Sequence, residues 1–183
     1  KYLSNKRRLL VIFRGINLNY YNPKNISDIK LLKLKKEWGV EDDKFKVLLP
    51  GRLTNWKGQL NFIEALNILI EDYKNENFQA FILGSDQGRN VYKKKLQSLI
   101  DRYNLGKKIK FIDHCKEMPL AYAISDVVIS SSIEPEAFGR VSVEAQAMQK
   151  PIIATNLGGS KETIINNKTG VLYKFDDPRE LAK

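Results

Sequence analysis

A regular alternation of short apolar runs with amphipathic stretches constrains the fold of this chain more than any other feature. Runs that predict strands occupy residues 46–49, 78–83, 109–112, 126–130, 151–154 and 170–173. Stretches of helical period separate them, at residues 59–73, 91–103, 119–124, 139–148 and 160–165. Apolar strands that alternate with helices are typical of a parallel sheet covered on both faces. We therefore predict an α/β fold, a doubly wound, mostly parallel sheet with helices on both faces.

Composition narrows the class of protein. With 183 residues, 43% of them hydrophobic, the chain can bury the core of one domain. One cysteine and one histidine are too few for a disulfide framework or a structural zinc site, which indicates a reducing compartment. No apolar run approaches the roughly 20 residues that span a bilayer, and the N-terminus lacks a secretory apolar region. We expect a cytoplasmic protein, and peripheral attachment to the cytoplasmic face of the inner membrane stays open.

The net charge of +10 raises the question of a polyanionic partner. Lysine-rich stretches at residues 30–36, 93–95 and 107–110 are scattered and lack the interleaved aromatics of a single-strand platform. We interpret them as solvated faces and expect no nucleic-acid partner. Contact with an anionic membrane, where a lipid-linked acceptor would be found, stays open as an alternative.

The loops that follow the predicted strands are the places to look for a ligand, because such sheets bind beyond the carboxyl ends of their strands. Three of these loops are unusual, at residues 50–58, 84–88 and 130–139. None of them contains a Walker A pattern or a GxGxxG fingerprint, which weakens the ordinary ATP and dinucleotide interpretations.

The first loop carries two cations, Arg52 and Lys57, on either side of a turn that opens a helix. A bidentate guanidinium and a point-charge ammonium at the mouth of the sheet suit a diphosphate leaving group on which negative charge builds. Trp56 lies between them in the sequence, and we expect it to pack in the core rather than cover the site.

The third loop carries the carboxylate of Glu136, and the helix predicted after it carries that of Glu144, with Gly139 between them. The helix predicted after Gly139 offers unpaired amides to a phosphate. Carboxylates are poor ligands for that anion, so we expect them to bind flanking hydroxyls, as on a nucleotide-sugar. Spacings of four and seven residues put one apolar stripe against the sheet, and Glu144 beside it, through Val141, Ala145 and Met148.

Three spaced motifs together resemble the donor-binding domain of retaining glycosyltransferases of family 4, or group 1, which have the GT-B fold. They are residues 51–58, the pair of glutamates eight positions apart, and residues 151–162. The resemblance runs from about Leu10 to the end. Residues 114–119 and 134–140 also resemble bacterial enzymes of lipopolysaccharide core assembly, including mannosyltransferases. The fold implied is the Rossmann-like C-terminal half of a GT-B enzyme.

The resemblance implies a role for each matching residue. The donor diphosphate would be held by Arg52, Lys57 and the main chain of Gly139, Arg140 and Val141. The donor sugar would contact Glu136, Ala137, Phe138 and Gly139. Glu144 would bind the ribose, and His114 and Cys115 the nucleobase. Asp113 departs from the glycine common in the family, and we expect it to cap its strand.

The activity implied is transfer of a hexose from a GDP- or UDP-sugar to a saccharide or lipid-linked acceptor in lipopolysaccharide or cell-envelope glycan synthesis. We expect no catalytic acid or base in this chain, since His114, its only histidine, would lie by the base and not by the anomeric carbon. No Asp-x-Asp motif is present, so we expect a metal-independent enzyme without a cofactor. The alternatives are a basic α/β module that binds nucleic acid or an anionic membrane without catalysis, and a nucleotide-sugar epimerase of GT-B fold.

Domain boundaries follow from the same resemblance. We expect an interdomain connection and first strand at residues 1–17 and the donor domain at residues 18–183. Its last helix, capped by Asp177 and Pro178, has few residues after it, which predicts truncation there. The N-terminal acceptor domain of the same polypeptide would be the missing partner, and we expect this fragment alone to be inactive.

Overall fold

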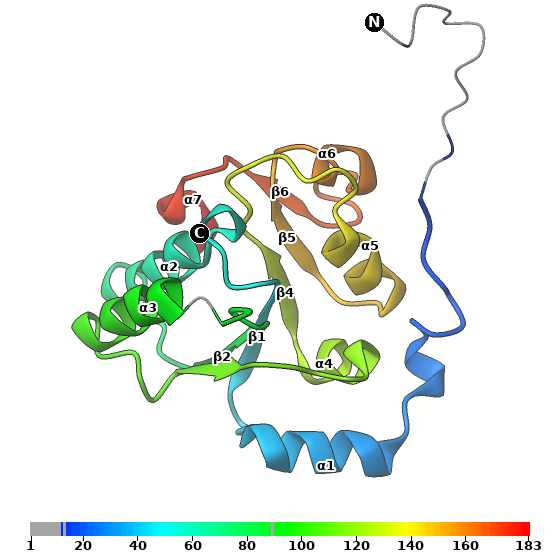
Figure 1. Cartoon of the computed structure of the whole chain (residues 1–183), viewed down its shortest axis with the longest axis horizontal. Coiled ribbons are helices and arrows are strands. Elements are labelled where there is room, and N and C mark those ends of the chain that lie inside the picture. The colour runs from blue at the N-terminus through cyan, green and yellow to red at the C-terminus, as the bar shows by residue number, and fades with distance from the viewer. Residues whose placement is uncertain (1–11, 13, 89) are drawn as a thin grey trace, which may run out of the picture.

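One parallel sheet forms the centre of the molecule. The computed structural model describes residue 12 and residues 14–88 and 90–183. Within this part of the chain, the strand order is β3-β2-β1-β4-β5-β6 (Figure 1). Every neighbouring pair is parallel. The strands are β1 (Phe45–Pro50), β2 (Phe78–Leu83), β3 (Ile109–Ile112), β4 (Val127–Ser130), β5 (Ile152–Thr155) and β6 (Val171–Tyr173).

Helices cover both faces of this sheet, which confirms the predicted fold class. They are α1 (Asp28–Trp38), α2 (Gln59–Glu71), α3 (Asn90–Arg102), α4 (Met118–Ile124), α5 (Arg140–Ala147), α6 (Ser160–Thr163) and α7 (Pro178–Ala182). In Figure 1, α2, α3 and α7 lie on one side of the sheet and α1, α4 and α5 on the other. Short 3₁₀ turns occupy residues 23–25 and 55–57.

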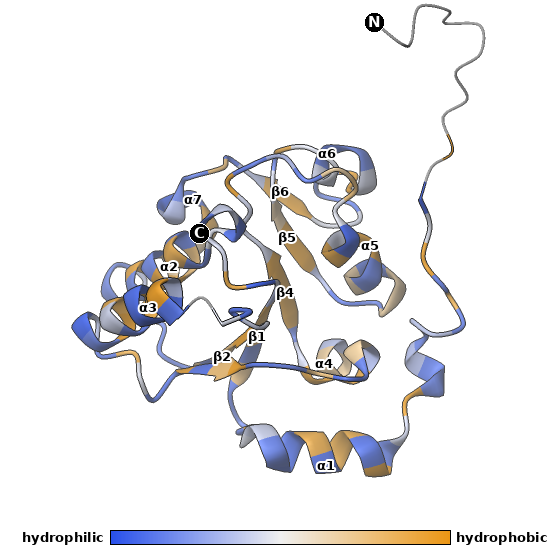
Figure 2. Cartoon of the chain, viewed as in Figure 1, coloured by the Kyte–Doolittle hydropathy of each residue, from blue (hydrophilic) through white to orange (hydrophobic). Residues whose placement is uncertain are grey.

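Alternating side chains of the central strands divide the core in two. Val47 and Leu49 of β1 pack in the cluster under α2 and α3, whereas Leu48 between them packs in the cluster under α1, α4 and α5. The strands are accordingly mostly apolar, while the helices show both kinds of residue (Figure 2). The stripe predicted on α5 is confirmed, because Ala145 and Met148 are buried in the second cluster. Val141 is half-buried against the same cluster.

Strand prediction from the sequence was accurate. The predicted strands at residues 78–83 and 109–112 match β2 and β3, and the other four differ by one residue at one end or at both. The predicted helices differ from the observed ones by at most two residues at an end.

One helix, α1, was absent from the prediction. It contains the lysine-rich stretch at residues 30–36 and begins after Ser27, whose hydroxyl accepts a bond from the Lys30 amide. It ends at Gly39 in the left-handed region, with φ of 58°. Trp38 attaches its last turn to the sheet, with its ring 5.4 Å from that of Phe81. Most of the other side chains of α1 are exposed, so the apolar periodicity is weak.

The predicted segment at residues 1–17 falls mainly outside the described residues, which begin with residue 12 and continue from residue 14. Residues 14–17 lie in no helix or strand. At the other end, the predicted N-cap is confirmed, since the Asp177 carboxylate accepts a bond from the Glu180 amide at 3.0 Å.

Candidate donor site

The centre of the sheet has the topology of a ligand-binding crevice. β1 pairs with β2 on one side and with β4 on the other. The sheet continues from β2 to β3 in one direction, and from β4 to β5 and β6 in the other, so the strand order reverses between β1 and β4. Six residue pairs are in register between β1 and β2, but only two between β1 and β4. Ligands of open α/β sheets bind beyond the strand ends at such a reversal.

The loops after β1 and β4 are joined by close backbone contacts. Gly58 has φ of 69°, and a Cβ there would lie 1.8 Å from the Ser131 carbonyl oxygen. The Ser131 hydroxyl donates to the carbonyls of Lys57 and Gly58, at 3.0 and 3.1 Å. The Ile133 amide donates to the Trp56 carbonyl at 2.8 Å. The two loops therefore form one rigid rim above β1 and β4.

Lys57 and Glu136 meet on this rim. The Lys57 ammonium lies 2.7 Å from Glu136 Oε1, and their side chains are 12% and 13% exposed. The Ser132 hydroxyl donates to the same oxygen. Two residues predicted to bind different parts of one ligand are thus in direct contact.

The prediction that Trp56 packs in the core is wrong. Its side chain is only half-buried and belongs to neither core cluster. Instead the Lys57 ammonium lies 4.4 Å from the centre of its ring, and the exposed Arg52 guanidinium lies 6.0 Å from it. The physical reason is that Trp56 lies in a 3₁₀ turn on the rim, where its ring faces cations.

The loop after β5 supports the start of α5. A Cβ on Gly158 would lie 2.7 Å from the Glu136 backbone, and one on Gly159 would lie 2.5 Å from the Phe138 carbonyl carbon. The Gly159 amide donates to the Glu136 carbonyl at 2.7 Å. Gly139 precedes α5 in the left-handed region, and no side chain caps the helix. Its first amides, at residues 139–141, therefore remain suited to an anion.

Glu144 lies one turn further along α5 and is almost fully buried, with 6% of its side chain exposed. Its Oε2 accepts a bond from the Tyr122 hydroxyl at 2.8 Å, and its Oε1 accepts bonds from Nε and Nη2 of Arg140, at 3.1 and 2.8 Å. Burial and the neighbouring carboxylate raise the pKa of Tyr122, so it stays a neutral donor. The same two causes raise the pKa of Tyr21.

The residues predicted to contact a base lie on a separate hollow. His114 and Cys115 follow β3 and line about 470 Å³ of space together with Lys30, Lys33 and Glu37 of α1, among others. His114 is exposed and Cys115 half-buried.

Cys115 and the neighbouring Asp113 both interact with other residues of the chain. The Cys115 thiol donates to the Glu117 carbonyl at 3.4 Å, and burial raises its pKa. Asp113, which we expected to cap the strand, forms an ion pair with Lys93 at 2.7 Å.

Three contributors were not assigned from the sequence. Ser132 bonds Glu136, Tyr122 bonds Glu144, and Tyr21 lies close to Arg140 and Glu144. The serine belongs to a run of three at the end of β4, a signal that could have been used. The tyrosines carry no local signal, because only the tertiary fold brings residues 21 and 122 to α5.

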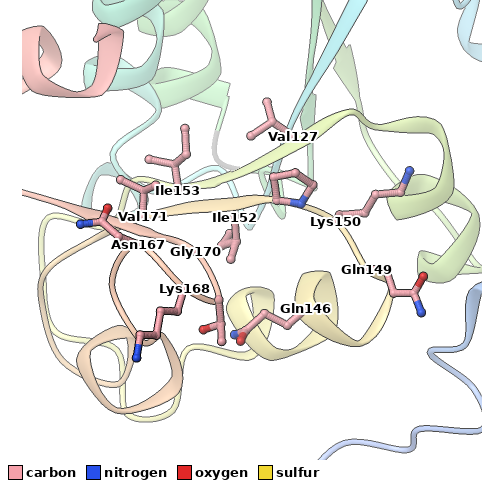
Figure 3. Close-up of a pocket in the computed structure, with 12 residues that line it drawn as sticks. Val127, Gln146, Gln149, Lys150, Ile152, Ile153, Asn167, Lys168, Gly170 and Val171 are labelled. Atoms are coloured by element: carbon pink, nitrogen blue, oxygen red, sulfur yellow. The ribbon is translucent and has the colours of Figure 1, made fainter.

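A larger hollow, of about 770 Å³, lies elsewhere (Figure 3). It is lined by Lys150, Ile152 and Val171, among others, at the amino ends of β4, β5 and β6. Because it faces the opposite edge of the sheet, it is not the crevice described above. Among the described residues, no helix is long and apolar enough to cross a membrane.

Comparison with known proteins identifies this architecture. The family model of glycosyl transferases group 1 matches residues 32–183. D-inositol 3-phosphate glycosyltransferase of Corynebacterium glutamicum is 28% identical over 183 residues, which cover 99% of this chain and 43% of that protein.

Solved structures agree with the family match. A glycosyltransferase from Rickettsia africae has 37% identity and a TM-score of 0.90, over 97% of this chain and 46% of that one. Anabaena HepE, solved with UDP and glucose, has 33% identity and a TM-score of 0.84, over 94% of this chain and 45% of that one. The chain thus spans less than half the length of each of these proteins. Since the family model covers most of it, the chain belongs to the glycosyl transferases group 1, enzymes of GT-B fold.

Proposed function

We propose that this chain is the donor-binding domain of a retaining glycosyltransferase that transfers a hexose from a nucleotide-sugar to a saccharide or lipid-linked acceptor. The observation that carries the proposal is the Lys57–Glu136 pair beside the uncapped start of α5, at the reversal of strand order. Cation, carboxylate and free amides match the diphosphate and hydroxyls of such a donor. Transfer itself would require the rest of a longer enzyme, and this chain alone would be inactive.

Each part of the donor has a proposed partner. The diphosphate contacts Arg52, Lys57 and the amides at residues 139–141. Glu136 uses Oε2 for hydroxyls of the sugar, since both bonds found within the described residues go to Oε1. Glu144 uses Oε1 for the ribose, which would displace Arg140, while Tyr122 keeps Oε2 in place.

Rate enhancement in this proposal comes from positioning and from cations that stabilise the departing diphosphate. No residue of this chain acts as acid or base, and no metal or other cofactor takes part. His114 and Cys115 contact the base from the hollow beside α1.

The donor proposed first is a UDP-sugar, because HepE was solved with UDP-glucose at 33% identity to this chain. A GDP-sugar is the second candidate and would fit a mannosyltransferase of lipopolysaccharide or cell-envelope glycan synthesis. We propose a cytoplasmic enzyme that meets its acceptor at the anionic inner face of the membrane.

Calorimetric titration of the chain with UDP, GDP and ADP tests the donor site. We expect one of them to bind, and both Lys57→Ala and Glu144→Ala to weaken that binding about tenfold or more. Repeating the titration with EDTA tests the absence of a metal requirement, and unchanged affinity is expected. Failure of all three nucleotides to bind, or full affinity in both variants, would rule out this site.

A further inference from the structure

The outward side of α1 is apolar as well as basic. Ile29 and Leu32 lie one turn apart on this helix and are 81% and 66% exposed. Residues three, four and seven positions apart share one face of a helix, so Lys33 and Lys36 lie beside them, and both lysines are exposed. These four residues form the outer face of α1. Two large apolar side chains thus lie in water among lysines that the sequence suggested to be a solvated face.

The opposite side of α1 attaches the helix to the domain. Leu31, Leu34 and Trp38, also three and seven positions apart, pack in the core cluster under α1, α4 and α5. The Lys30 ammonium pairs with Glu117, which precedes α4, at 2.9 Å. The helix lies along one edge of the molecule (Figure 1). The outer face is therefore held in a fixed position, and a partner that binds it would not have to fold the helix.

The charges of the outer face favour an anionic partner. In the described part of the chain, neither Lys33 nor Lys36 pairs with a carboxylate. The two acidic residues of α1 lie at the margins of this face, Asp28 at the first helical position and Glu37 in the hollow that contains His114. The net charge of the chain is +10. The outer face therefore presents positive charge that no neighbouring acidic side chain neutralises.

An anionic bilayer fits this combination better than other partners do. Nucleic acid would use the lysines but would leave Ile29 and Leu32 in water. A second copy of the chain would place the same lysines opposite one another, because a two-fold interface uses one patch on both subunits. At a bilayer surface, apolar side chains enter the boundary of the acyl chains, while lysine ammoniums extend to the lipid phosphates.

We propose that the outer face of α1 binds the surface of an anionic bilayer. Ile29 and Leu32 insert below the headgroups, and Lys33 and Lys36 contact lipid phosphates. The helix lies in the plane of the interface, since its 11 residues are too few to cross a bilayer. The proposal deepens the proposed function and rests on it in one respect: this surface brings the enzyme to the membrane that holds a lipid-linked acceptor.

The outer face is separate from the proposed donor site. Ile29, Leu32 and Lys36 are absent from the lining of the hollow that contains His114, whereas Lys33 borders that hollow. A test of the membrane surface that leaves the donor site intact therefore changes only the first three residues.

Co-sedimentation with lipid vesicles tests the proposal. One set of vesicles contains phosphatidylcholine alone, and the other contains phosphatidylcholine and phosphatidylglycerol at two to one, without nucleotide. We expect the chain to bind the mixed vesicles about tenfold or more tightly than the neutral ones, and this binding to weaken as salt is added. Failure to bind the mixed vesicles, or equal binding to both kinds, overturns the proposal.

Ile29→Ser combined with Leu32→Ser is the decisive variant. We expect it to weaken binding to the mixed vesicles about tenfold or more, because the apolar contact is lost while the charge is unchanged. Lys36→Gln should weaken that binding about fivefold, the effect of one lysine near an anionic surface. Binding as strong as that of the wild type in both variants overturns the proposal.

Val91→Ser on α3 is the matched control. Val91 is 84% exposed, and Lys94 and Lys95 follow it at the same spacing of three and four residues. Its vesicle binding should equal that of the wild type, and a loss as large as that of the double serine variant overturns the proposal. Sedimentation without vesicles covers the other occupant: a dimer that the double variant dissociates would assign the face to a second copy and would also overturn it.

The membrane proposal and the donor proposal fail in different experiments. UDP affinity should be unchanged in the double serine variant, and its loss would place the outer face in the donor site and overturn the membrane proposal. Absence of vesicle binding leaves the nucleotide titrations unaffected. If the wild-type chain binds vesicles but no nucleotide, the donor proposal fails, and the membrane surface stands without its link to the acceptor.

Discussion

The ammonium of Lys57 lies 2.7 Å from a carboxylate oxygen of Glu136, although 79 residues separate them in the chain. This contact compensates two charges that are mostly buried. In the proposed complex, the diphosphate competes with Glu136 for the same ammonium. Binding the leaving group would then release the carboxylate toward the sugar, so recognition of the two parts of the donor is coupled.

Glu136→Gln separates these two roles. The variant removes the charge that competes for Lys57, so we expect UDP to bind about threefold more tightly. The extra affinity of UDP-glucose over UDP should disappear, because the amide is a poorer acceptor for sugar hydroxyls. Calorimetry with both ligands measures the difference, and Glu162→Gln on α6 serves as an exposed control. A loss of UDP affinity as large as that of Lys57→Ala would contradict the coupling.

Tyr122→Phe should destabilise the fold. The substitution leaves the buried Glu144 carboxylate without one of its donors, which typically costs about 1.5–3 kcal/mol in free energy of unfolding. Urea denaturation measures this change.

Tyr173→Phe is the matched control for that variant. The Tyr173 hydroxyl is buried and has no hydrogen-bond partner among the described residues. Its removal should therefore cost no stability. Equal losses in Tyr122→Phe and Tyr173→Phe would show that the bond to Glu144 contributes nothing.

Gly58→Ala should prevent the close contact between the loops after β1 and β4. The residue has φ of 69°, and the new methyl group would lie 1.8 Å from the Ser131 carbonyl oxygen. We expect a loss of about 3 kcal/mol or more in free energy of unfolding. Gly88→Ala isolates the backbone contribution, because its φ is 78° and a Cβ there has open space. That variant should lose only about 1 kcal/mol. Similar losses in both would mean that the contact with Ser131 relaxes easily.

The thiol of Cys115 should react slowly. Burial raises its pKa, so at pH 8 less of it is thiolate than in an unfolded chain, and the thiolate is the reactive form. Because this is the only cysteine, thiol titration with and without urea reports on it alone. UDP should slow the reaction further if the base binds here, whereas an unaffected rate would remove Cys115 from the proposed site.

The sheet was predictable because its signals are local. Each strand is a short, mostly apolar run between polar turns, and burial on both faces keeps most of its residues apolar, as in β2. By contrast, α1 exposes most of its length and rests on Trp38, so its apolar pattern is weak. The N-cap residue Ser27 and the C-cap residue Gly39 were the sequence signals from which α1 could have been predicted.

The site was predictable only as a set of residue types near one edge of the sheet. Arg52, Lys57 and Glu136 could be identified as candidates because they lie in loops after predicted strands, and the structure brings them to one rim. Contacts between distant segments could not be predicted, because sequence spacing says nothing of them. Trp56 was misplaced for a different reason. Its ring lies against two cations of its own loop, Arg52 and Lys57, and a tryptophan between turn residues does not reveal whether it packs in the core or on the rim.

The seam between β1 and β4 has two registered pairs, the fewest between any two neighbouring strands described, compared with six between β1 and β2. On one side of the seam lies the loop with Lys57, and on the other lies the start of α5. A diphosphate that reaches both would act as a cross-link between the two halves of the domain. Ligand binding would then also suppress separation of these two strands, which would be measured as slower hydrogen exchange of the amides at residues 47–48 and 127–128.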